Sequence, residues 1–87
     1  MPHHKALAAA FEDEVVILDA EGNTLLVLDS WAAWIWRSCE GSSTRAIHSA
    51  TGGILERVEE TLHALARAGL ILPVGDAWVR SPVEWVP

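Results

Sequence analysis

Residues 15–28 read VVILDAEGNTLLVL, and the prediction of the fold starts from this stretch. It contains two runs of β-branched and leucine side chains, at 15–18 and 24–28, which are typical of β-strands. The link at 20–23 supplies the glycine and asparagine that favour a turn, so the stretch predicts a β-hairpin. Residues 7–11 predict a shorter strand beside it, although their alanines also suit a helix.

The second strand of this hairpin is apolar on both faces. Leu25, Leu26, Val27 and Leu28 follow one another without a polar residue, so they place apolar groups on each side of the sheet. An antiparallel sheet in a small protein usually has one face in water. We therefore expect the surplus apolar face to be a binding surface.

Three helices are predicted after the hairpin. The first begins at Trp31, with Asp29 or Ser30 as its cap, and ends before Gly41. A short helix capped within 42–44 runs through Ile47, and Gly52-Gly53 ends it. A third covers 54–68 and stops at Gly69.

Helical spacing of about 100° per residue assigns faces to these helices. In the first helix it places Trp36 in the core and Trp34 outside it. The core face of that helix is predicted to hold Trp31, Ala32, Ile35, Trp36 and Cys39, with Ala33 outside it. The core stripe of the third helix is predicted to hold Ile54, Leu55, Val58, Leu62, Leu65 and Ala66.

The C-terminal residues predict a small hairpin between 70–72 and 77–79, followed by a tail laid on the surface. We divide the chain into one domain over 1–72 and a Pro/Trp-containing tail over 73–87. The fold class is α+β, resembling a winged helix-turn-helix, with an N-terminal three-stranded antiparallel sheet followed by three helices.

Composition excludes several classes of protein. The chain has 87 residues, of which 51% are hydrophobic and 21% charged, which fits one folded domain. Twelve acidic against six basic side chains give a net charge of −6, which disfavours nucleic acid. One cysteine excludes a disulfide framework. No segment is long and apolar enough for a membrane span, so we expect a cytoplasmic protein.

The chemically reactive side chains do not form a catalytic pattern. Cys39 lies on the predicted core face of the first helix, where an inert thiol is expected. His48 lies beyond the short helix, with no nucleophile near it in the sequence, and His63 forms an ordinary exposed pair with Glu59. His3 and His4 are expected to be solvated. The sequence therefore predicts no enzyme activity, metal site or cofactor.

A binding module remains, and the third helix offers a candidate surface. Arg57, Thr61, Ala64 and Ala68 align just outside its core stripe, and three of the four are small. They either open a groove or allow the helix to pack closely on a sheet. The second and third helices also resemble a helix-turn-helix, but the third carries Glu56, Glu59 and Glu60 against only two arginines, which disfavours DNA binding.

The order of these pieces resembles the PqqD-like family, the recognition elements of ribosomally synthesised and post-translationally modified peptides (RiPPs). The residues that carry the resemblance are Leu28-Asp29, Ile35-Trp36, Glu40-Gly41, Ser43-Thr44 and Ile47. It covers residues 5 to 72, and the small stand-alone proteins of lasso-peptide pathways are the most similar branch. Asp29 stands where the family more often has Asn.

The resemblance implies a function without chemistry of its own. The leader segment of a precursor peptide would add as a strand to the edge of Thr24, Leu25, Leu26, Val27 and Leu28, and lie against Arg57, Thr61, Ala64 and Ala68. A separate leader peptidase would be the direct partner, with a cyclase as a further one. Because backbone bonding alternates along a strand, we expect only one of Leu25 and Val27 to direct its N–H outward.

Two other functions stay open on the sequence alone. A winged-helix regulator would bind an operator with steep salt dependence. A small structural subunit would pack permanently on an enzyme and aggregate when isolated.

Overall fold

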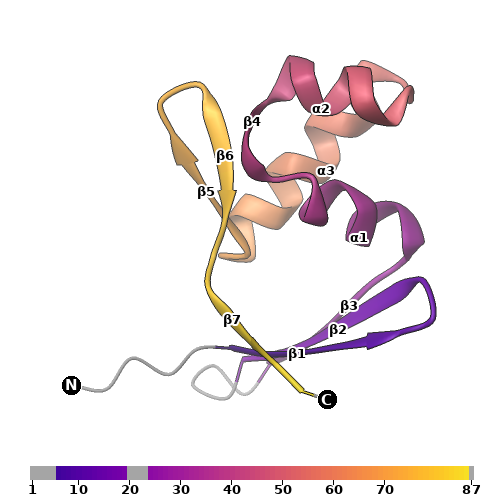
Figure 1. Cartoon of the computed structure of the whole chain (residues 1–87), viewed down its shortest axis with the longest axis vertical. Helices are drawn as coiled ribbons and strands as arrows, with labels where there is room; N and C mark the ends of the chain where they lie inside the picture. The colour runs from indigo at the N-terminus through magenta and orange to yellow at the C-terminus, as the bar shows by residue number, and fades with distance from the viewer. Residues whose placement is uncertain (1–5, 20–23, 87) are drawn as a thin grey trace. The chain divides into compact units, whose positions relative to one another are not determined.

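The computed structural model describes residues 6–19 and 24–86 (Figure 1). The predicted turn at 20–23, His3 and His4 lie outside the described residues. The described chain contains strands and three helices, as the α+β prediction requires. It divides into two compact units, one formed by Met1–Ala33 with Pro82–Pro87 and the other by Trp34–Ser81.

The first unit is built on a four-stranded sheet in the order β3-β2-β1-β7. Strands β1 (Ala6–Phe11), β2 (Glu14–Asp19) and β3 (Thr24–Leu28) pair antiparallel, which confirms the predicted hairpin and its third strand. Glu12 and Asp13 form the turn between β1 and β2, and Glu12 adopts a left-handed φ of 58° there.

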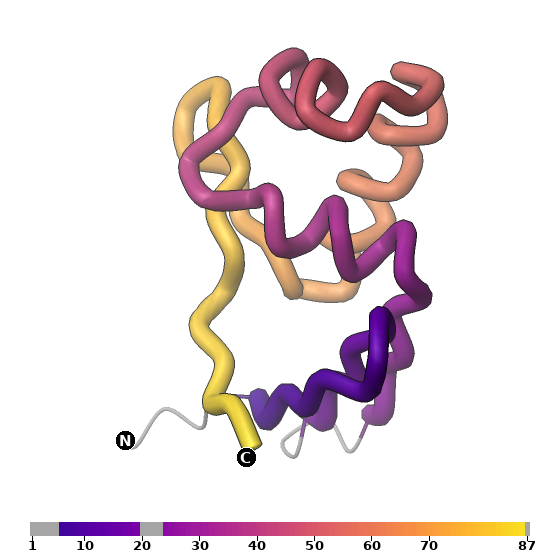
Figure 2. The backbone as a smooth tube through the Cα atoms, turned by 45° about the vertical axis from the view of Figure 1, so that its right-hand side comes forward, coloured from indigo at the N-terminus to yellow at the C-terminus, as the bar shows by residue number. Residues whose placement is uncertain are grey.

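The expectation of a three-stranded sheet and a surface tail is wrong at the C-terminus. Strand β7 (Val83–Trp85) pairs parallel with β1, opposite Ala6, Leu7 and Ala8 (Figure 1). The chain runs from β6 through Ser81 into β7 as one continuous segment, yellow in Figure 2. A parallel pair between the two ends of a chain has no local turn signal, and this strand was therefore missed.

Helix α1 covers Ser30–Arg37, and the Asp29 carboxylate caps it by accepting from the Ala32 N–H at 2.8 Å. The predicted extension to Gly41 is wrong. The helix tightens at its end, where the Cys39 N–H donates to the Trp36 carbonyl at 3.1 Å. The chain then enters strand β4 (Glu40–Ser43), and Gly41 lies at the register shift of that strand with a φ of 85°.

Helices α2 (Thr44–Thr51) and α3 (Leu55–Arg67) agree with the sequence within a few residues. The Ser43 hydroxyl caps α2 by accepting from the Ala46 N–H, and Gly52 ends it in the left-handed region. Because α2 continues to Thr51, His48 lies within this helix and not beyond it.

The second unit also contains a three-stranded sheet in the order β4-β6-β5. Strands β5 (Ile71–Val74) and β6 (Ala77–Arg80) form the predicted C-terminal hairpin, with a tighter turn at Gly75-Asp76. Strand β4 pairs antiparallel with β6, a pairing that the sequence did not predict.

Burial confirms most of the predicted core positions. Trp36, Ile35 and Cys39 are fully buried, and Trp34 is 48% exposed. The buried side chains of the first unit are Ala8, Val15, Ile17, Leu28 and Ala33, and those of the second are Ile35, Trp36, Cys39, Ile47, Val58, Leu62, Leu65, Leu70 and Ile71. Within the described residues, no helix is long and apolar enough to cross a membrane.

Three core assignments are corrected. Ala33, predicted to lie outside the core, is buried. Ile54 and Leu55, predicted in the core stripe, are exposed. Ile54 is the N-cap of α3 and has extended backbone angles, so its side chain does not follow the helical arc.

Candidate functional site

Strand β3 is an edge strand. It pairs with β2 on one side, and no other strand within 6–19 and 24–86 pairs with it. The opposite edge of the same sheet is occupied by β7. An edge strand presents backbone N–H and C=O groups to its surroundings, so the sheet has one edge open to an added strand.

The register shows which residues of β3 present these groups. The Val86 N–H donates to the Ala8 carbonyl at 2.8 Å, so the backbone groups of Ala8 face β7 and not β2. Ile17 lies opposite Ala8, and its groups therefore face β3. Leu26 lies opposite Ile17, and its groups face β2.

Leu25 and Val27 are the neighbours of Leu26, so both direct their backbone groups to the open edge. The expectation that only one of the two does so is wrong. Bonding alternates between adjacent residues, and positions two apart have the same orientation. The two side chains are also prominent, with Leu25 62% and Val27 59% exposed.

The remaining residues of the predicted strand site, Thr24, Leu26 and Leu28, lie opposite Asp19, Ile17 and Val15 on β2. Leu28 is buried and Leu26 half-buried. These three residues therefore hold β3 against β2, and Leu25 and Val27 direct their backbone groups to the open edge.

The helix residues predicted for the site form one stripe on the second unit. Arg57, Ala64 and Ala68 are exposed and Thr61 is half-buried. The Thr61 hydroxyl donates to the Arg57 carbonyl at 2.8 Å. The Ala68 N–H donates to the Ala64 carbonyl at 3.1 Å, so Ala68 continues the helical path one residue beyond α3. We call these four residues the α3 shoulder.

The reactive side chains have structural partners. Burial raises the pKa of the Cys39 thiol from its ordinary value of 9.0 to about 11, against a smaller opposing effect of the Arg80 charge. The thiol also lies 3.3 Å from the Ile35 carbonyl, to which it donates. The His48 ring contacts the Gly53 carbonyl at 2.8 Å, and the His63 ring packs edge-on against Trp78. These groups hold the fold together.

No group of three or more His, Cys, Asp or Glu side chains within the described ranges could hold a metal ion.

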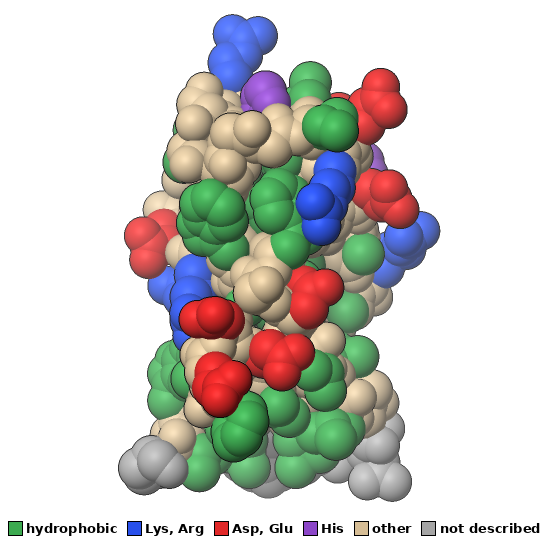
Figure 3. Space-filling view, turned by 90° about the vertical axis from the view of Figure 1, so that its right-hand side faces the viewer, with side chains coloured by type: hydrophobic (Ala, Val, Ile, Leu, Met, Phe, Trp, Pro, Cys, Tyr) green, Lys and Arg blue, Asp and Glu red, His purple; other side chains and the backbone are tan. Residues whose placement is uncertain are grey.

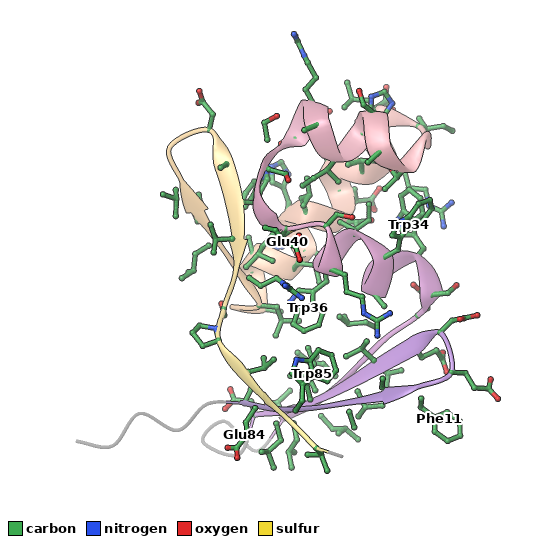
Figure 4. All side chains as sticks on the ribbon, viewed as in Figure 1. Phe11, Trp34, Trp36, Glu40, Glu84 and Trp85 are labelled. Atoms are coloured by element: carbon green, nitrogen blue, oxygen red, sulfur yellow. The ribbon has the colours of Figure 1, made fainter. Side chains whose placement is uncertain are left out.

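Sequence reasoning missed a cluster around Trp36 and β6. The Arg80 guanidinium lies 5.4 Å from the centre of the Trp36 ring and forms an ion pair with Glu40 at 3.1 Å. The Trp78 indole donates to the Thr44 hydroxyl at 2.9 Å. Figure 4 labels Trp36 and Glu40 of this cluster. The apolar run at 77–79 predicts strand β6. Its partner β4 is not predicted, because the sequence places the end of the first helix and the cap of the second in that stretch.

Comparison with known proteins identifies the family. The sequence model described as "Coenzyme PQQ synthesis protein D (PqqD)" matches residues 14–71, which is more than half of the chain. No curated protein and no solved structure gave a significant match. Proteins of this family are non-catalytic accessory proteins of RiPP biosynthesis, which bind a precursor peptide and act with biosynthetic enzymes. The chain belongs to the PqqD family.

Proposed function

We propose that this protein binds the leader segment of a lasso-type precursor peptide and presents it to a separate leader peptidase and a cyclase. The leader adds as a strand along the open edge of β3. The proposal places the recognition domain within residues 1–72, in a winged helix-turn-helix arrangement in which α2 and α3 are the two helices. It also places the protein in the cytoplasm, where precursor peptides are made.

The observation that carries the proposal is the orientation of Leu25 and Val27. Both direct their backbone groups to an edge at which no described strand pairs. Strand addition takes affinity from main-chain hydrogen bonds and specificity from the alternate side chains beside them. The exposed Leu25 and Val27 side chains supply apolar contacts on one face of the added strand.

The α3 shoulder is the second surface proposed for the leader. Its two alanines have short side chains, so a side chain of the peptide can approach the helix backbone closely. Arg57 is the arginine of the shoulder, on a helix that also exposes Glu56, Glu59, Glu60 and, in its last turn, Arg67. We therefore expect an acidic leader side chain near Arg57.

The function is tested by titrating the chain with fluorescent synthetic leader segments of lasso-type precursor peptides. We expect saturable binding, and protection of the Leu25 and Val27 amides from hydrogen exchange only when the leader is present. A scrambled leader of equal composition is the control. Binding without protection of these amides would exclude strand addition at β3, and equal binding of the scrambled leader would exclude leader recognition.

A further inference from the structure

The outer face of the four-stranded sheet carries a second surface, which adjoins the leader edge and shares Leu25 and Val27 with it. The register places Leu25 beside Leu18 and Val27 beside Val16 on this face, and Leu18 pairs in turn with Leu7 of β1. Phe11 belongs to the same face, because it lies two residues beyond Ala9, the partner of Val16. Figure 4 shows Phe11 and Glu84 on one side of the sheet and Trp85 on the other.

The side chains of this face are exposed although they are apolar. Phe11 is 67% exposed, Leu25 62%, Val27 59% and Leu18 36%. Together they present roughly 400 Å² of apolar surface, within the range of the largest patch on a typical monomer, which is often functional. The half-buried Val16 and Ala9 connect Phe11 with the other three residues. We call the four exposed residues the outer patch.

Carboxylates border the outer patch. Glu14 lies opposite Phe11, and Glu84 lies opposite Leu7. Within 6–19, 24–33 and 82–86 the first unit has six acidic side chains and no Lys, Arg or His, the acids being Glu12, Asp13, Glu14, Asp19, Asp29 and Glu84. All six are exposed. Figure 3 shows hydrophobic side chains with Asp and Glu beside them in its lower part.

This charge pattern distinguishes between occupants. A second copy of the chain would bring two acidic borders together, and each copy has a net charge of −6. The patch is also about half of the roughly 800 Å² per partner that a stable interface buries, so it is too small for a dimer without help from its border. A partner with an apolar centre and a basic border matches both features.

We infer that the outer patch is the docking surface for the leader peptidase, which offers an apolar surface bordered by Lys and Arg. This inference rests on the proposed function, since it assigns the enzyme that receives the bound leader. The leader and the enzyme thus bind two different parts of one sheet. The leader binds the backbone edge of β3, and the peptidase binds the side-chain face of the sheet, where Phe11 of β1 and Leu18 of β2 lie away from that edge.

The test uses the full chain, a synthetic leader that it binds and a lasso-pathway leader peptidase that cleaves the same precursor, each purified separately. Phe11→Thr and Leu18→Thr change the outer patch on strands β1 and β2, away from the leader edge. Leu72→Thr on β5 is the matched control, because Leu72 is also an exposed strand leucine, at 52%. Peptidase binding is measured by calorimetry, leader binding by fluorescence polarisation, and the oligomeric state by sedimentation.

We expect Phe11→Thr to weaken peptidase binding about tenfold or more and Leu18→Thr to weaken it less. Leader binding and melting temperature should stay unchanged, and Leu72→Thr should behave like the wild type. Peptidase binding should also weaken with rising salt, because the border charges are screened. If Phe11→Thr does not fold, Leu18→Thr carries the comparison.

Three results would overturn the inference: peptidase binding that is absent or unaffected by both outer-patch variants, a dimer of the chain that Phe11→Thr dissociates, or loss of leader binding in both variants. A wild-type chain that binds no leader would instead overturn the proposed function, and the separate leader titration distinguishes that failure from the others.

Discussion

The indole N–H of Trp36 donates a hydrogen bond to the Leu70 carbonyl at 3.1 Å, and the Trp36 side chain is fully buried. The same carbonyl accepts from the Ser81 N–H at 2.9 Å. This oxygen, in the segment between α3 and β5, thus joins α1 to Ser81, the residue that follows β6. Trp36 is therefore both packed in the core and hydrogen-bonded where three segments of the second unit meet.

Trp36→Ala should lower the free energy of unfolding by about 3–5 kcal/mol, enough to unfold a domain this small. Trp34→Ala should cost less than about 1 kcal/mol, because that side chain is half exposed. Trp36→Phe should fall between them, since the Leu70 carbonyl keeps its Ser81 partner. Urea denaturation measures all three, and a larger loss for Trp34→Ala than for Trp36→Ala would contradict the assigned helix faces.

The edge of β3 can be tested with proline at adjacent positions. Val27→Pro should fold and lose leader affinity at least tenfold, about 1.4 kcal/mol, because its N–H faces the open edge. Leu26→Pro should instead lose about 1–3 kcal/mol of stability, because its N–H is directed to β2. Leu25→Pro should resemble Val27→Pro. If Leu26→Pro proves as stable as Val27→Pro, the assigned orientation is wrong.

Ala64→Glu tests whether the α3 shoulder binds or only packs. Ala64 is exposed, so the melting temperature should change little, while leader affinity should fall at least tenfold, about 1.4 kcal/mol. Ala50→Glu, at an exposed alanine of α2, is the control and should bind the leader normally. Unfolding of Ala64→Glu would mean that the small residues are packing contacts, and the shoulder would then be excluded as a leader surface.

Arg57→Glu should reduce leader affinity more at low salt than at high salt, because screening removes the repulsion that it introduces. Arg57 lies in the first turn of α3, where a negative charge favours the helix, so the loss should not come from unfolding. Arg67→Glu, in the last turn, should be slightly less stable and bind normally. An Arg57→Glu affinity that is independent of salt would exclude an ionic contact at this position.

Because Cys39 is buried, the free energy of unfolding should decrease as the pH rises above 9. Its pKa is about 11 in the folded protein, above the ordinary value of 9.0, so only the unfolded chain ionises as the pH first rises past 9. The folded state should lose about 2–3 kcal/mol between pH 9 and pH 11 relative to a Cys39→Ala variant. Unfolding curves for both proteins across this range measure the difference, which should be absent below pH 8. A parallel pH dependence of the two would show that Cys39 does not contribute.

The strand proposed to bind the leader was predicted from the sequence only in part. The hairpin at 15–28 and its surplus apolar face predicted where a peptide would bind, because leucine on both faces of a strand is visible in one dimension. The orientation of Leu25 and Val27 was predicted incorrectly, and only the pairing of Ala8, Ile17 and Leu26 corrected it. The α3 shoulder was predicted from helical spacing, and its alanines are exposed as that spacing requires.

Features that depend only on neighbours within one helical turn or one hairpin could be predicted from the sequence alone. Helix α3 and the caps at Asp29, Ser43 and Gly52 belong to this group, because their hydrogen bonds join residues three to four positions apart. Only the tertiary structure decided the pairings between distant segments. Strand β4 ends α1 early because it pairs with β6, and β7 joins the sheet beside β1 although most of the chain separates them. Such pairings are selected by the fit of whole surfaces, and no residue pattern within either strand encodes the partner.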